Sequence, residues 1–108
     1  MTNDDLLALD ATEQAAKVRS RSISAKELIE ATLARIDDIE PQVSAFRIVM
    51  TEHARAEAER IDSLSNAELA RLPLAGVPVA IKDDTDVAGQ STMWGSPIDR
   101  GVSKNDAE

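Results

Sequence analysis

The chain has 108 residues, enough for one small domain, and its 20 acidic and 12 basic side chains give a net charge of −8. Nucleic acids and anionic membranes are bound by clustered Lys and Arg, so this balance argues against both as direct partners. There is no cysteine, which excludes disulfides, thiol nucleophiles and thiolate metal sites.

The N-terminus does not have the features of an export signal. Its first five residues are mostly polar and acidic, and they lead into a short apolar run, Leu6 to Leu9, with no basic flank. No apolar run approaches the length of a membrane span. We therefore expect a soluble, cytoplasmic protein.

Capping patterns predict two helices in the first 40 residues. Asp10-Ala11-Thr12-Glu13 has the form of a capping box, which predicts a helix from about Ala11 to Arg19. Ser24-Ala25-Lys26-Glu27 is a second such box. Apolar residues follow it at intervals of three and four, which predicts an amphipathic helix that Pro41 ends. These residues are Leu28, Ile29, Thr32, Leu33, Ile36 and Ile39.

The next segments are less regular. Val43 to Met50 mixes β-branched residues with Phe46 and fits either a short strand or a connector. Thr51 to about Ile61 is rich in good helix formers, and its single histidine, His53, is expected on the helix surface and not at a metal site. Ser65 to Glu68 indicates one more helical turn through Leu72, or else a variable loop.

The most apolar run of the chain lies between Pro73 and Lys82. Counting by twos places Val77, Val79 and Ile81 on one face of an extended strand, and the opposite face is also apolar. A strand that is apolar on both faces is usually covered on both sides, as in α/β proteins. Lys82 would then emerge where a buried strand stops.

Two interpretations of Lys82 follow from residue types alone. A lysine at a strand end is most often a solvated terminator or an ion-pair partner, here for Asp83, Asp84 or Asp86. A buried lysine can instead lose its proton and act as a base for a hydroxyl nucleophile. Residue types favour the solvated interpretation and do not exclude the catalytic one.

The segment after Lys82 is rich in Asp, Thr, Gly and Ser, a composition typical of turns and functional loops. The spacing of Asp84 and Asp86 does not continue into a calcium loop, so solvated carboxylates are expected. Asn105 to Glu108 has the form of a helix start with no helix after it. Together with a strand that needs neighbours, it predicts the N-terminal piece of a larger protein.

The residues from Leu74 to Asp83, with Asp86 to Gly89 and Thr92 to Ser96, resemble the first block of the amidase signature family. The similarity extends more weakly back to the Asp10 helix. In that family the lysine at the position of Lys82 is the general base of a Ser-cisSer-Lys triad that hydrolyses carboxamides. The resemblance therefore favours the catalytic interpretation of Lys82.

The resemblance also implies what surrounds this lysine. The fold would be α/β, with N-terminal helices packed on the first strands of a mixed sheet, and residues 1–108 would be the truncated N-terminal part of a single amidase domain. Within it, a helical segment would span about 10–72 and the core strand and loop about 73–104. The substrate would be a small-molecule amide, no metal or organic cofactor would be needed, and a homo-oligomer is left open.

The chain departs from the family pattern in two ways. The family usually has Lys-Asp-Asn where this chain has Lys82-Asp83-Asp84, and the added carboxylate would favour a protonated lysine. The segment that carries both serines and the oxyanion donors would lie downstream of Glu108. Since a base without a nucleophile forms no acyl-enzyme, the chain alone is expected to be inactive.

Two alternatives stay open. The chain could belong to the amidase subunit of a tRNA-dependent amidotransferase. It could also be a non-enzymatic helical interaction module, in which Leu28, Leu33 and Ile36 face a partner and Lys82 is only a strand end.

Overall fold

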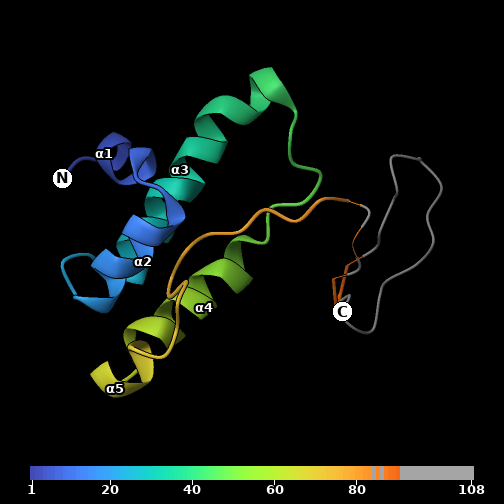
Figure 1. Cartoon of the computed structure of the whole chain (residues 1–108). Coiled ribbons are helices and arrows are strands. Elements are labelled where there is room, and N and C mark those ends of the chain that lie inside the picture. The colour runs from blue at the N-terminus through green and yellow to red at the C-terminus, as the bar shows by residue number, and fades with distance from the viewer. Residues whose placement is uncertain (84, 86, 91–108) are drawn as a thin grey trace. The chain divides into compact units, whose positions relative to one another are not determined.

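The computed structural model describes residues 1–83, 85 and 87–90, and the chain divides into two units, Met1–Pro78 and Val79–Glu108. The described part of the first unit contains five helices (Figure 1). They are α1 (Asn3–Ala8), α2 (Ala11–Arg19), α3 (Ala25–Val43), α4 (Thr51–Asp62) and α5 (Asn66–Leu69). Helix α3 packs against both α1 and α4. No helix among the described residues is long and apolar enough to cross a membrane.

Three of the predicted helices begin where a side chain caps them. Asp10 accepts the N–H of Glu13 at 2.8 Å, and α2 has the predicted bounds. Ser24 accepts the N–H of Glu27 at 2.9 Å at the start of α3. Ser65 caps α5, which ends three residues before the predicted Leu72. These starts are predictable because capping signals are local.

Helix α4 forms without a side-chain cap. It extends one residue past the predicted Ile61, and His53 is exposed on it, as the sequence predicts. Its residues are mostly Ala, Glu and Arg, which are good helix formers. Propensity and the packing of Ala58 and Ile61 therefore determine where this helix lies.

Helix α1 is not among the helices predicted from the sequence. The Thr2 hydroxyl accepts the N–H of Asp5 at 3.1 Å, and the Asp5 carboxylate accepts the N–H of Thr2 at 2.9 Å. The pKa of Asp5 is lowered, first by the bond from the Thr2 backbone N–H to its carboxylate and then by the Thr2 side chain, because both favour the charged form. The helix places Leu6, which is buried, in the core.

Helix α3 continues past Pro41, so the prediction that Pro41 ends it is wrong. A proline in a helix lacks one N–H and crowds the preceding turn, which costs the hydrogen bond to the carbonyl four residues earlier but does not prevent the two residues after Pro41 from staying helical. The helix ends instead at Ser44, which has a φ of 49° and donates its N–H to the carbonyl of Glu40 at 2.8 Å. Residues 44–50 then form a connector and no strand.

The core of the first unit is aliphatic and centres on α3. Leu28 is fully buried, as are Ala25 from the same helix and Leu69 from α5. The remaining members come from α1, α2, α3 and α4 and from two connecting segments: Leu6, Val18, Ile23, Ile29, Ala31, Leu33, Ala58, Ile61 and Ala75. Because small and medium side chains dominate, backbone segments can approach one another closely.

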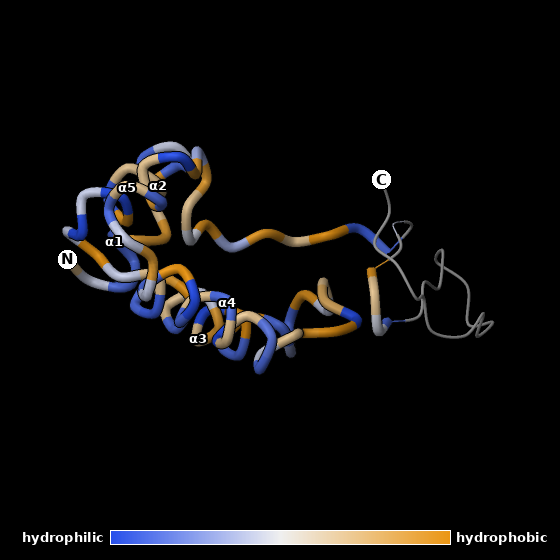
Figure 2. The backbone as a smooth tube through the Cα atoms, turned by 90° about the horizontal axis from the view of Figure 1, so that it is seen from below, coloured by the Kyte–Doolittle hydropathy of each residue, from blue (hydrophilic) through white to orange (hydrophobic). Residues whose placement is uncertain are grey.

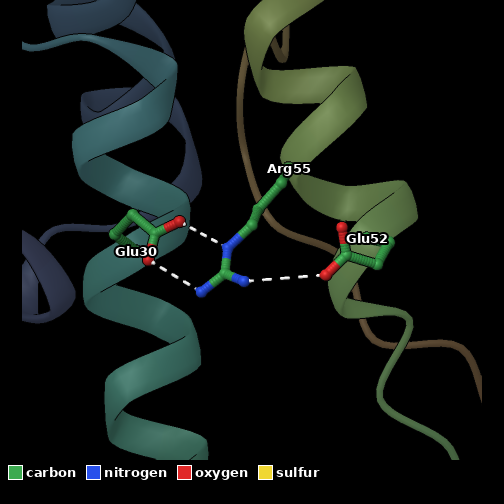
Figure 3. Close-up of polar contacts among 3 residues, drawn as sticks. All are labelled: Glu30, Glu52 and Arg55. Carbon is green, nitrogen blue, oxygen red and sulfur yellow. Dashed lines mark hydrogen bonds and ion pairs between the residues drawn. The ribbon is translucent and has the colours of Figure 1, made fainter.

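A polar contact joins α3 and α4 on the surface. Arg55 of α4 donates from Nε to Oε1 of Glu30 at 2.7 Å and from Nη2 to Oε2 at 3.2 Å (Figure 3). Its Nη1 lies 3.8 Å from an oxygen of Glu52, one turn earlier on α4. The hydrogen bonds from Arg55 lower the pKa of Glu30.

The predicted strand at residues 77–81 is not formed. These residues lie outside any helix or strand, and no strand occurs elsewhere in the described part of the chain. The tube in Figure 2 is mostly hydrophobic along this stretch, yet Val79 is 74% exposed and Ile81 55% exposed. A strand exists only when another strand pairs with its backbone, and the described residues supply none. The described part is therefore helical, and the buried α/β strand is not observed in it.

Candidate active site

Lys82 is the candidate catalytic residue, and it opens a turn in the second unit. Its carbonyl accepts the N–H of Thr85 at 3.1 Å, and its side chain is exposed. The apolar residues before it form no strand, so the predicted position of Lys82 at the end of a buried strand is not observed. The burial that a lysine base needs is not provided by the described residues.

Several predicted features near Lys82 lie outside the described residues. These are the effect of Asp84, the calcium interpretation of Asp84 and Asp86, and the helix start at Asn105 to Glu108. Asp83, which directly follows Lys82, is described and half-buried. Within the described ranges, no group of three His, Asp or Glu side chains could hold a metal ion.

The segment that leads to Lys82 begins with a tight turn seated on the helices of the first unit. The carbonyl of Leu74 accepts the N–H of Val77 at 3.1 Å, and Gly76 has a φ of +73°. A positive φ at the third position is the signature of a type II turn, which favours glycine. Ala75, inside the turn, is only 2% exposed.

Gly76 lies directly on helices α2 and α3. A Cβ atom at this position would be 3.0 Å from Cβ of Ala25 and 3.2 Å from a methyl carbon of Val18. Contacts this short are sterically unfavourable, so the backbone reaches this position only because residue 76 has no side chain. The turn before Lys82 is thus fixed by both conformation and packing.

An arginine of α2 binds the two residues that lead into this turn. Nη1 of Arg19 donates to the carbonyls of Leu72 at 3.2 Å and Pro73 at 2.8 Å. The sequence alone indicates no role for Arg19. No local pattern could have revealed one, because more than 50 residues separate the partners.

A shallow hollow of about 360 Å³ lies beside this turn. It is lined mostly by apolar groups and contains no hydroxyl or carboxylate side chain. The lining residues are Arg60, Ile61, Leu72, Pro73, Leu74, Ala75 and Gly76. Without a nucleophile or an acid, the hollow is not suited to amide chemistry of its own.

Comparison with known proteins shows the family of this chain. The family model described as Amidase matches residues 27–108, which includes the turn and Lys82. The chain belongs to this amidase family. The resemblance seen in the sequence is therefore confirmed.

Relatives of this amidase-family chain carry two kinds of name. The "Putative amidase AmiB2" of Mycobacterium bovis is 40% identical over 108 residues, which is all of this chain and 23% of that protein. A glutamyl-tRNA(Gln) amidotransferase subunit of Streptomyces avermitilis is 42% identical over 100 residues, or 93% of this chain and 20% of that protein. The chain thus spans less than a quarter of the curated relatives it matches.

A solved structure matches most of this chain. Its description is "An unexpected vestigial protein complex reveals the evolutionary origins of an s-triazine catabolic enzyme". The two chains are 32% identical with a TM-score of 0.81, over 91% of this chain and 22% of the other. At that identity and score, the amidase-family chain shares a fold with the matched part of the solved structure.

The burial of α3 bears on the interaction-module alternative. Leu28 is fully buried and Leu33 is 7% exposed, so both pack inside the first unit. Of the three residues named for that alternative, only Ile36 is partly exposed. A face made of these residues is therefore not available to a partner.

Proposed function

We propose that the protein carrying this chain hydrolyses carboxamide C–N bonds and that Lys82 is its general base. The observation that supports this most strongly is the family match, which runs through Lys82, together with 40% identity to AmiB2 along the whole chain. The catalytic role of Lys82 itself rests on the motif in which it lies.

In the proposed mechanism, neutral Lys82 takes a proton, through a bridging serine, from a nucleophilic serine. The serine oxygen attacks the amide carbonyl carbon, the C–N bond breaks, and the proton goes to the leaving amine. Water then hydrolyses the acyl-enzyme and regenerates the serine. By the family resemblance both serines would lie after Glu108, so residues 1–108 would contribute the base and not the nucleophile.

We further propose that residues 1–108 belong to one amidase domain with an α/β core in the cytoplasm. The exposure of Val79 and Ile81 supports this, because apolar residues at alternating positions are suited to pairing and burial in a sheet. Burial of this segment would also provide the desolvation that a lysine base needs.

A second candidate is the amidase subunit of a tRNA-dependent amidotransferase. It is favoured by the 42% identity to the Streptomyces amidotransferase protein. A protein of this kind would copurify with the subunits that handle the tRNA and would release ammonia from glutamine in their presence. A free-standing amidase would be active without them.

The test is to assay the complete natural protein for ammonia release from a panel of aliphatic and aromatic primary carboxamides. We expect time-dependent ammonia release with stoichiometric formation of the carboxylic acid. Failure to hydrolyse any carboxamide, with or without partner subunits, would refute the proposal.

A further inference from the structure

The turn before Lys82 is attached to the helices of the first unit at one place. Arg19 of α2 contacts the carbonyls of Leu72 and Pro73, which lead into it and with it form the segment called here the Leu72–Gly76 turn, and Gly76 lies on Ala25 and Val18. These contacts come from the last turn of α2 and the first turn of α3. The beginning of the segment that carries Lys82 is therefore fixed on the helical unit.

Arg19 binds this turn through a single nitrogen that serves two acceptors. Nη1 donates to both Leu72 and Pro73, and hydrogen bonds from a charged donor are stronger than those between neutral groups. The Leu72 carbonyl also accepts the N–H of Ala75 at 3.3 Å. Arg19 thus stabilises both the turn and its attachment to α2.

Prolines stiffen both ends of the turn. Pro73 and Pro78 each have a fixed φ, and each restricts the residue before it, Leu72 and Val77. Only a few residues then separate the turn from Lys82. At about 3.3 Å per extended residue, the chain from Gly76 to Lys82 spans at most about 20 Å.

We infer that Arg19 is a positioning residue for Lys82: by fixing the Leu72–Gly76 turn on α2, it sets where the segment carrying the base begins. This inference rests on the proposed function, because it assumes that Lys82 is the base. Arg19 acts only through the backbone of the turn and is not a catalytic residue. Loss of this attachment lets the segment start from several positions, so Lys82 is less often in line with its serine partner.

Arg21 offers a matched control. It donates to Asn66 Oδ1 at 3.1 Å, to the Asp62 carbonyl at 3.2 Å and to the Leu64 carbonyl at 2.6 Å. These acceptors lie at the end of α4 and the start of α5, before the turn. Arg21 therefore supports the helical unit with its own set of hydrogen bonds, none of which goes to the turn.

The experiment compares Arg19→Ala, Arg19→Lys and Arg21→Ala in the complete natural protein. We expect Arg19→Ala to lower kcat about 10-fold or more while KM for a carboxamide changes less than about 2-fold. Arg19→Lys should recover most of kcat, because an ammonium group can also donate to two carbonyls. Arg21→Ala should reduce stability but leave kcat per folded molecule near that of the natural protein.

Hydrogen exchange measured on a peptide covering residues 74–82 gives a second result that does not need activity. Its amides should exchange faster in Arg19→Ala than in Arg21→Ala. Equal exchange in these two variants would refute the claim that Arg19 holds the turn. Faster exchange in Arg19→Ala with an unchanged kcat would refute the claim that this attachment positions Lys82. A natural protein that hydrolyses no amide would refute the proposed function and the positioning role with it, whereas an active protein with an unaffected Arg19→Ala variant would refute the positioning role alone.

Discussion

Asp62, the last residue of α4, accepts the backbone N–H of Ala25, the first residue of α3, at 2.7 Å. Its second carboxylate oxygen accepts the N–H of Lys26 at 3.0 Å. The first amides of a helix have no partner within the helix and carry partial positive charge, so a carboxylate there is stabilising. The start of α3 is therefore also capped by a residue 37 positions away.

Replacing this cap should destabilise the protein. Asp62→Ala removes both hydrogen bonds to α3 and should lower the free energy of unfolding by about 1–2 kcal/mol. Asp62→Asn keeps one acceptor oxygen and should lose less. Urea unfolding of the three proteins checks this order, and equal losses for Ala and Asn would show that the charge and not the hydrogen bonds is decisive.

Gly76 should be more sensitive to substitution than a glycine with a similar backbone. Gly76→Ala forces a side chain into a φ of +73° and against Ala25, with an expected loss of about 2–4 kcal/mol. Gly89→Ala is the control, because Gly89 has a φ of +81° but no atom of the described residues within 4 Å of its added Cβ. Its loss should be about 1 kcal/mol. Similar losses at both sites, measured by urea unfolding, would contradict the close approach of Gly76 to α3.

A stabilising substitution is expected at the end of α3. Ser44 has a left-handed backbone, with a φ of 49°, which glycine adopts at no steric cost. Ser44→Gly should therefore raise the free energy of unfolding by about 0.5–1 kcal/mol. Ser63→Gly, at the end of α4, should give no gain because Ser63 has a right-handed helical backbone with a φ of −84°. An increase for Ser63→Gly as large as that for Ser44→Gly would refute the explanation.

The Glu30–Arg55 pair should make stability depend on pH in acid. The pKa of Glu30 is lower in the folded than in the unfolded chain, so the folded form binds fewer protons as the pH falls. The stabilising effect is complete above the ordinary pKa of about 4.5 and is lost as the pH falls through the lowered pKa. Glu30→Gln should thus be less stable than the natural protein at pH 7 and equally stable near pH 2.

Unfolding midpoints from pH 2 to 7 test this dependence. Glu59→Gln, on the exposed side of α4, is the matched control for loss of one carboxylate. A stability difference for Glu30→Gln that does not change with pH would contradict the role of the ion pair.

The sequence predicts those parts of this fold that depend on neighbouring residues. The capping box at Asp10 places α2 correctly, and Thr2 with Asp5 is an equivalent signal from which α1 could have been predicted. The end of α3 is wrongly predicted at Pro41 because local rules do not say how much of the last turn a proline tolerates.

Features that depend on distant residues could not be predicted. The role of Arg19 arises from contacts with a connecting segment more than 50 residues later, and that of Asp62 from a contact between α4 and α3. Alternating apolar residues predict a strand at residues 77–81, but strand formation also needs a pairing partner. The motif around Lys82 singles this residue out, and its catalytic role stays a prediction.

The most direct test of the catalytic prediction is the activity of Lys82→Ala in the complete natural protein, with Lys26→Ala, an exposed lysine on α3, as the matched control. If Lys82 is the base, kcat/KM for a carboxamide should fall by about 10²–10⁴-fold without a change in the unfolding transition, and Lys26→Ala should stay active. Turnover by Lys82→Ala within a few-fold of the natural protein would contradict the account.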